Sequence, residues 1–144
     1  MIWLLRHGDA EHGVMPDFDR DLTEKGERQS RAAGNALKVL GVELDVCLTS
    51  PRVRARRTAE LACEALGAPI EEDDRLAGDD FDPLELAAGR GEVMLVGHEP
   101  SFSSAIALVT GSRVKMRKGG IAALDDHLLH MLLGPKQLRA IAGG

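Results

Sequence analysis

Short apolar runs alternate with longer amphipathic segments along this chain, and this alternation limits the folds that it can adopt. Runs such as Ile2–Leu5 and Val93–Val96 are apolar throughout, which is typical of strands that are covered on both faces of a sheet. In the segments between the runs, alanine and leucine recur at helical spacing. Strands that alternate with helices predict an α/β protein: a three-layer α/β/α sandwich with a mostly parallel central sheet.

Residues that start or stop helices mark the ends of several predicted elements. Thr23 is placed to cap a helix over Glu24–Leu40, and Gly41 follows its last turn. The pair Ser50-Pro51 is expected to open a second helix, with its proline at the first helical position. The other expected elements are strands at Leu44–Leu48, Pro69–Glu71 and Val93–Val96, helices at Asp82–Ala88 and Ser101–Thr110, and a hairpin of Ile121–Leu124 with Leu128–Leu133.

Length and charge restrict the kinds of partner. The 144 residues are expected to form one domain over residues 1–144. The net charge of −5 argues against nucleic acid or an anionic membrane as a partner, so an anion site must be local. No signal-peptide pattern is present, and no apolar run approaches the ~18 residues of a membrane helix, so we expect a cytoplasmic protein. Cys47 and Cys63 are expected to be reduced and buried.

Two histidines and two arginines stand near the ends of predicted strands. Arg6 and His7 follow the first apolar run, His98 follows another, and Ser50 opens the stretch that leads to Arg54. Since ligands bind beyond the carboxyl ends of strands in open α/β sheets, these loops should meet at one edge. Neutral imidazole is a nucleophile, and guanidinium groups match phosphate oxygens. The pattern indicates phosphoryl transfer by His7, with Arg6, Arg54 and His98 as a phosphate clamp that requires no metal.

The same residues resemble the signatures of a known family. The family is the histidine phosphatase superfamily, which has the phosphoglycerate mutase fold. Three stretches of this chain resemble its three signatures: Arg6-His7-Gly8, Ser50-Pro51…Arg54-Ala55…Thr58-Ala59 and Gly97-His98-Glu99-Pro100. Three further stretches resemble the small SixA-type phosphohistidine phosphatases of this superfamily: Gly8-Asp9-Ala10, Asp17…Arg20 and Leu22-Thr23…Gly26. The resemblance runs in order from Met1 to about Leu133.

This resemblance implies a role for each residue of the site. His7 would attack phosphorus in line and form a transient phosphohistidine, which water would hydrolyse. Arg6, Arg54 and His98 would hold the phosphoryl oxygens. Asp17 is expected to contact the substrate and is the first candidate for a general acid. The other candidate acids are Asp19, Asp79, Asp80 and Glu99.

The chain also departs from the family pattern in two places. Larger members carry a general acid in an insertion, but here a short stretch joins Thr58 to Gly97 without a matching acid, and Asp21 stands where SixA-type proteins often have proline. A phosphorus–nitrogen bond needs less help from an acid than an alkoxide does, and a short connection implies an open site. Both points favour phosphohistidine on a protein as the substrate. The alternatives are a small-molecule phosphomonoesterase with the same pocket, or a module that binds phosphohistidine without turnover, against which the intact His7 counts.

The remaining histidines and basic residues are expected to have structural roles. No cofactor or metal site is predicted, because no pair at ligand spacing accompanies the other histidines, His12, His127 and His130. Arg20 either lies at the rim of the pocket or forms a surface salt bridge. A solvated surface is expected for the basic residues Arg52, Arg56, Arg57, Lys115, Arg117 and Lys118.

Overall fold

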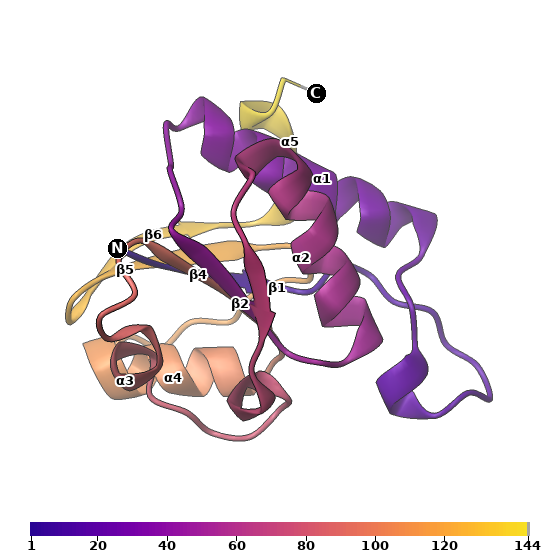
Figure 1. Cartoon of the computed structure of the whole chain (residues 1–144), viewed down its shortest axis with the longest axis horizontal. Helices are drawn as coiled ribbons and strands as arrows, with labels where there is room; N and C mark the ends of the chain where they lie inside the picture. The colour runs from indigo at the N-terminus through magenta and orange to yellow at the C-terminus, as the bar shows by residue number, and fades with distance from the viewer. Residues whose placement is uncertain (144) are drawn as a thin grey trace.

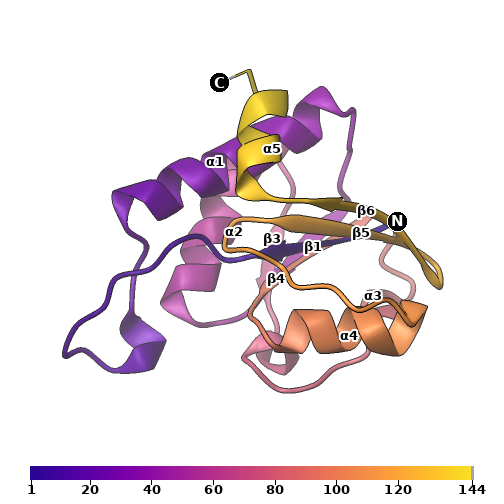
Figure 2. The same cartoon turned by 180° about the vertical axis from the view of Figure 1, so that it is seen from behind.

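The computed structural model describes residues 1–143 and has a six-stranded central sheet. Its strands are β1 (Ile2–Arg6), β2 (Val46–Thr49), β3 (Ile70–Glu72), β4 (Val93–Gly97), β5 (Ile121–Asp125) and β6 (Leu128–Leu133). Its helices are α1 (Glu24–Val39), α2 (Val53–Leu66), α3 (Pro83–Ala87), α4 (Ser101–Thr110) and α5 (Pro135–Ile141), with short 3-10 turns η1 (Asp17–Asp19) and η2 (Asp74–Leu76). Helices α1, α2 and α5 cover one face of the sheet and α3 and α4 the other (Figures 1 and 2). The predicted three-layer sandwich is confirmed.

The order of the strands is β3-β2-β4-β1-β5-β6. The first four are parallel, whereas β5 pairs antiparallel with β1, and β6 with β5, as the predicted hairpin requires. Strand β4 lies between β1 and β2: Gly97 is opposite Arg6, and Val96 is opposite Thr49. The loops that follow these three strands therefore leave the sheet side by side.

Each central strand contributes to two separate cores, because successive side chains of a strand point to opposite faces. In β1, Ile2 and Leu4 pack in the core under α3 and α4, while Trp3 and Leu5 pack in the core under α1, α2 and α5. All four side chains are buried. Burial on both faces is the physical reason why the strands read as continuous apolar runs.

Helix α1 has the start and stop that its sequence predicts. The hydroxyl of Thr23 accepts a hydrogen bond from Gly26 N at 3.1 Å, and Gly41 after the last turn has a φ of 79°. Within the helix, Gly34 lies against the backbone of α2, where a Cβ atom would overlap the carbonyl of Ala62. Small residues thus let the two helices pack closely over the sheet.

The helices differ from the prediction in two places, one at a helix start and one in a helix that was missed. Helix α2 begins at Val53 and not at Ser50-Pro51, because Ser50 N still donates to Val96 O at 2.9 Å and continues the pairing of β2 with β4. Helix α5 was not predicted at all, since its seven residues with a single buried leucine, Leu138, are too short for a periodic pattern.

The two cysteines lie in the core. Cys47 and Cys63 are both free and buried, as predicted. No helix within residues 1–143 is long and apolar enough to cross a membrane.

Candidate active site

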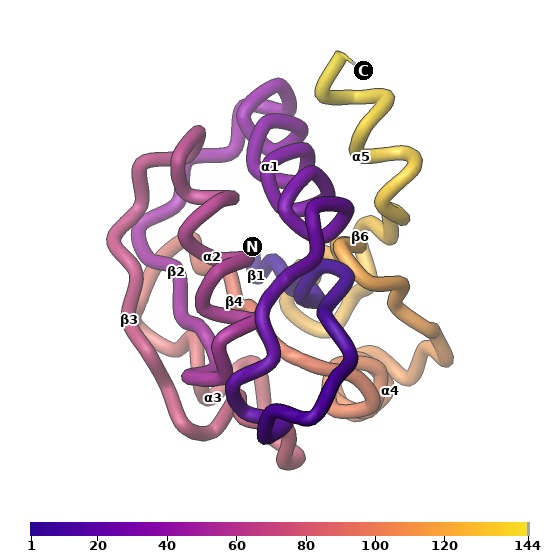
Figure 3. Tube along the Cα trace, turned by 90° about the vertical axis from the view of Figure 1, so that its right-hand side faces the viewer, coloured from indigo at the N-terminus to yellow at the C-terminus, as the bar shows by residue number. Residues whose placement is uncertain are grey.

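Three loops meet at the carboxyl edge of the parallel strands. Figure 3 views the molecule from this end, with the indigo segment that follows β1 in front. His7 N donates to Gly97 O at 3.0 Å, so the β1–β4 pairing continues one residue beyond the strand. The imidazole rings of His7 and His98 consequently lie close together, with their centroids 5.2 Å apart. Sheet pairing thus brings together two histidines that are far apart in sequence.

The His7 imidazole is neutral and has a defined tautomer. Its Nδ1 lies 2.7 Å from the carbonyl oxygen of Gly8, which can only accept, so Nδ1 carries the proton and Nε2 carries the lone pair. The residue is 6% exposed. Burial, opposed by the Gly8 hydrogen bond and reinforced by the charges of Arg54 and Arg6, lowers the pKa of His7 to about 4. At neutral pH, Nε2 is therefore available as a nucleophile.

The loop that carries His7 is fixed by contacts with two helices. Gly8 N donates to the hydroxyl of Thr58 at 3.1 Å, and that hydroxyl donates to Arg54 O at 2.7 Å within α2. A Cβ on Gly8 would lie 2.6 Å from Gly26 O of α1, so only glycine fits there. One hydroxyl of α2 thus links the loop of His7 to the turn of the helix that holds Arg54.

Both arginines of the predicted clamp lie near His7. Arg54 is 8% exposed, and desolvation by burial lowers the pKa of its guanidinium, while the neighbouring Asp17 raises it. Arg6 donates from Nη1 to Met116 O at 2.9 Å, and burial likewise lowers its pKa, against the opposing charge of Glu99. Arginine stays protonated at neutral pH despite such shifts. Two cations therefore stand beside the neutral imidazole.

Asp17 lies at the centre of an arginine cluster. Its Oδ2 accepts from Arg52 at 2.8 Å and from Arg54 at 3.3 Å, while its Oδ1 accepts from Arg20 at 3.0 Å. Its backbone carbonyl also accepts from Arg54 Nη1 at 2.8 Å. The hydrogen bond from Arg20 and the nearby arginine charges lower the pKa of Asp17. The carboxylate is thus held ionised, which suits it for orienting Arg54 rather than for donating a proton.

Arg52 was expected to be simple solvated surface, and this expectation was wrong. Its Nε donates to Ala77 O at 2.8 Å, and its Nη1 is paired with Asp17. Helical spacing places Arg52 one turn away from Arg56, which does lie in a surface ion pair with Glu60. Only the position of the segment that carries Asp17 distinguishes the two arginines, so no signal in the sequence could have found this contact.

His98 completes the group of charged and polar side chains. Its Nε2 lies 2.8 Å from the Ser50 hydroxyl, and the residue is 5% exposed. Burial, followed by the proximity of His7 and Arg54, lowers the pKa of His98 to about 3. The ring is neutral without a bound anion. A bound phosphoryl dianion would raise this pKa and favour the doubly protonated form.

Two buried polar atoms of the clamp have no hydrogen-bond partner within residues 1–143. They are Arg6 Nε and His98 Nδ1. An unsatisfied buried polar atom costs about 1–3 kcal/mol. Each belongs to a residue that was singled out as a phosphate ligand, and phosphoryl oxygens are acceptors that could satisfy them. The arrangement is suited to holding an oxyanion.

The remaining candidates lie in other contacts. Glu99 accepts from Ser103 N at 2.7 Å and from Met116 N at 3.2 Å, so both of its oxygens are engaged. Asp79 and Asp80 line a separate cavity with Arg75. Within residues 1–143, no three His, Cys, Asp or Glu side chains converge as a metal site would require.

Some of the outlying basic residues are also paired. Lys118, expected to be solvated, pairs with Asp9 at 3.4 Å. Arg20 forms the salt bridge expected for it, with Asp17 at 3.0 Å, and also donates to Glu11 O at 2.6 Å.

This α/β protein thus has a neutral, buried histidine near two guanidiniums at the carboxyl edge of its parallel strands, an arrangement suited to binding an oxyanion. The sequence model of the histidine phosphatase superfamily (branch 1) matches residues 2–90, and the chain belongs to this superfamily. Membership of this superfamily supports a phosphatase or mutase type of enzyme.

Relatives by sequence are of two kinds. An uncharacterized protein of Picosynechococcus sp. is 35% identical over 95% of this chain and 98% of its own length. A 2,3-bisphosphoglycerate-dependent phosphoglycerate mutase of Methylobacterium sp. is 45% identical, but the match covers 48% of this chain and only 35% of the mutase. The likeness to mutases is thus limited to one part of a longer protein.

Solved structures resemble the chain over nearly its whole length. The protein histidine phosphatase SixA complexed with tungstate has a TM-score of 0.84 and 27% identity, covering 95% of this chain and 98% of that one. A putative phosphohistidine phosphatase SixA from Agrobacterium tumefaciens has a TM-score of 0.81 and 26% identity, covering 93% and 97%.

Proposed function

We propose that this protein is a metal-independent phosphatase that removes phosphate from phosphohistidine on a protein, with His7 as the nucleophile. The observation that carries the proposal is the state of His7: a neutral imidazole whose Nδ1 proton is directed to Gly8 O, which leaves Nε2 free beside Arg6 and Arg54. Similarity in length and fold to SixA proteins supports the same substrate class.

The proposed reaction has two steps. Nε2 of His7 forms a bond to phosphorus while the phosphorus–nitrogen bond of the substrate breaks, and the leaving nitrogen keeps the electron pair. Water then attacks phosphorus, the bond to His7 breaks, and inorganic phosphate leaves. Arg6, Arg54 and His98 bind the equatorial oxygens in both steps, where charge stabilisation supplies most of the catalysis.

The state of the nearby carboxylates favours a labile substrate. Asp17 is ionised in its arginine cluster, and both oxygens of Glu99 accept backbone hydrogen bonds. Neither is placed as a protonated acid for an alkoxide leaving group. An imidazole leaving group needs less assistance, so phosphohistidine fits this site better than a sugar phosphate does.

A second candidate is a small-molecule phosphomonoesterase or mutase that uses the same residues. The similarity to phosphoglycerate mutase over 73 aligned residues favours it. The two candidates differ in substrate and not in the role of His7, so only a comparison of substrates distinguishes them. A module that binds phosphohistidine without turnover is a third, weaker alternative, since such a module needs no nucleophile.

The test compares a phosphocarrier protein that bears phosphohistidine with a set of phosphomonoesters, all in the presence of EDTA. Release of phosphate from the protein, absent in His7→Ala, supports the proposal. Turnover of phosphomonoesters alone moves the assignment to the second candidate, and binding without turnover supports the third. Inhibition by EDTA contradicts the metal-free mechanism. Rapid quenching should trap an acid-labile phosphate on His7, and a phosphate trapped on another residue would refute the assignment of the nucleophile.

A further inference from the structure

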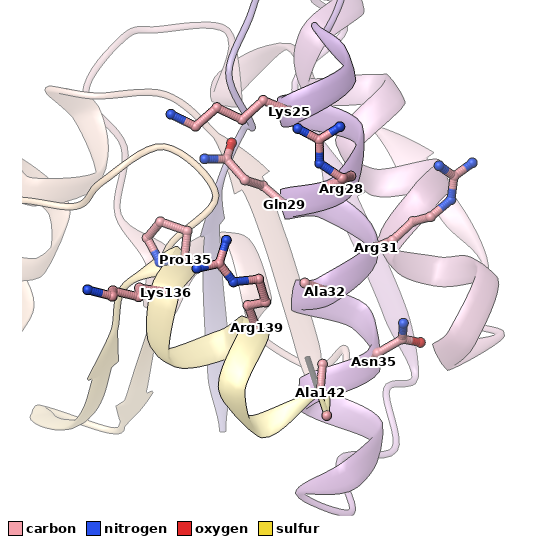
Figure 4. Close-up of a pocket in the computed structure, with 11 residues that line it drawn as sticks. Lys25, Arg28, Gln29, Arg31, Ala32, Asn35, Pro135, Lys136, Arg139 and Ala142 are labelled. Atoms are coloured by element: carbon pink, nitrogen blue, oxygen red, sulfur yellow. The ribbon is translucent and has the colours of Figure 1, made fainter.

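A groove with an unusual concentration of positive charge lies between α1 and α5 (Figure 4). Its cavity is about 610 Å³. Among residues 1–143, no acidic side chain lines it, although the chain has 23 acidic and only 18 basic residues. We call it the basic groove, and its cations are Lys25, Arg28, Arg31, Lys136 and Arg139.

Most of this charge is not neutralised by neighbours. Arg31 is the exception: it pairs with Glu64 at 3.4 Å and points to the far side of α1 in Figure 4. The other four have no carboxylate within 4.0 Å among residues 1–143, namely Lys25, Arg28, Lys136 and Arg139. Cations of one sign along a groove raise the local concentration of acidic ligands and speed their association.

The shape of the basic groove indicates the kind of anion. Half-buried Ala32, Pro135 and Ala142 form an apolar floor, while the cations around it are exposed to solvent. Lys25 comes from α1, and Arg139 comes from α5 on the other side of the groove (Figure 4). Sites for small molecules usually bury most of their ligand. Exposed cations on both sides of an apolar floor instead fit an extended acidic segment of another protein.

One side chain connects the basic groove to the loop that carries His7. Gln29 lines the groove, and its Oε1 accepts from Asp9 N at 2.8 Å, two residues after His7. The same side chain packs against Gly119, whose N donates to the carbonyls of Arg6 and His7 at 3.1 and 3.0 Å. The groove therefore begins beside the candidate active site and continues away from it between the helices.

We propose that the basic groove docks an acidic segment of the protein substrate whose phosphohistidine enters the site at His7. This inference rests on the proposed function and extends it, because it specifies which phosphohistidine proteins are preferred. Docking would be remote from the reacting atoms, so it should lower KM for acidic substrates and leave kcat unchanged.

The experiment uses synthetic peptides that carry one phosphohistidine followed by a run of glutamates or a run of serines. At low ionic strength, kcat/KM for the glutamate peptide should exceed that for the serine peptide by about tenfold, the sum of a few exposed charge pairs. Salt should erase the difference. In Arg28→Glu/Arg139→Glu the preference should disappear through KM. The matched control is Lys38→Glu/Arg113→Glu, which changes the net charge equally at exposed positions outside the groove and should keep the preference.

Failure of this inference and failure of the proposed function give different results. Equal kcat/KM for the two peptides in the wild type, or a preference that survives charge reversal in the groove, overturns the docking proposal. Hydrolysis of free phosphohistidine should be the same in all variants, and failure of the wild type to hydrolyse either phosphohistidine peptide would refute the proposed function. In that case, anisotropy measurements with the unphosphorylated glutamate peptide still decide: weakened binding only in Arg28→Glu/Arg139→Glu supports docking, and unchanged binding refutes it.

Discussion

Replacing Gly26 by alanine tests whether His7 depends on the close contact between its loop and α1. A Cβ at this position would overlap Asp9 O and lie 2.9 Å from Asp9 N. The backbone two residues after His7 must then retreat by roughly an ångström. Alanine gains up to ~1 kcal/mol of helix propensity over glycine, but such overpacking costs about 1–3 kcal/mol. A displacement of about 1 Å at a catalytic group lowers activity by about a hundredfold.

The matched control is Gly34→Ala, in the same helix. Its Cβ would overlap the carbonyl of Ala62 in α2, and the three nearest atoms all belong to Ala62 and none to the loop that carries His7. Both variants should melt at lower temperature by circular dichroism. Only Gly26→Ala should lose about a hundredfold in kcat/KM on the phosphohistidine protein and bind tungstate more weakly. Wild-type kcat/KM in Gly26→Ala, or an equal loss in Gly34→Ala, would refute the reasoning.

Three further predictions follow from the electrostatics of the site. Burial lowers the pKa of His7 to about 4 and that of His98 to about 3. Below pH 6.5 the unfolded chain therefore binds more protons than the folded protein does. The free energy of unfolding should fall as the pH is lowered from 6.5 to 4, by about 3 kcal/mol for His7 alone. Urea melts whose midpoints do not change over this pH range would contradict the lowered pKa values. Asp17→Asn removes the carboxylate that orients Arg54, so tungstate affinity by calorimetry should fall severalfold, at about 0.2–1 kcal/mol for the pair, and tighter binding would show that the charge instead competes with the anion for the arginine. Ser50→Ala removes the partner of buried His98 Nε2, so it should lower kcat about tenfold and lower the melting temperature by several degrees, since an unpaired buried polar atom costs about 1–3 kcal/mol; an unchanged kcat would exclude an orienting role for the hydroxyl.

Most of the sheet could be predicted from the sequence because burial leaves a strong local pattern. A strand covered on both faces is apolar along its buried length, as Ile2–Leu5 of β1 and Val93–Val96 of β4 are. Helix α1 carries its own cap in Thr23 and its own stop in Gly41. Where local signals conflict with tertiary contacts, prediction fails: Ser50-Pro51 predicts the start of a helix, but the backbone of Ser50 continues the sheet and its hydroxyl contacts His98.

The residues of the candidate site also differ in whether the sequence could place them. Arg6, His7 and His98 follow parallel strands, so the topology of the sheet alone places them at one edge. Asp17 is different, because it lies on a segment whose path no periodic pattern specifies. Its contact with Arg52 and Arg54 exists only because that segment folds back over the start of α2.

The sequence by itself determined the fold class and the edge of the sheet where the candidate nucleophile and the proposed phosphate clamp lie, since the carboxyl ends of parallel strands share one edge whatever the side-chain packing. Tertiary structure alone decided which imidazole nitrogen of His7 is free, why Asp17 is held ionised, and where the cations of α1 and α5 gather. The physical reason is that burial, tautomer and pKa depend on atoms distant in sequence, and exposed charges such as Arg139 are not constrained by any apolar repeat.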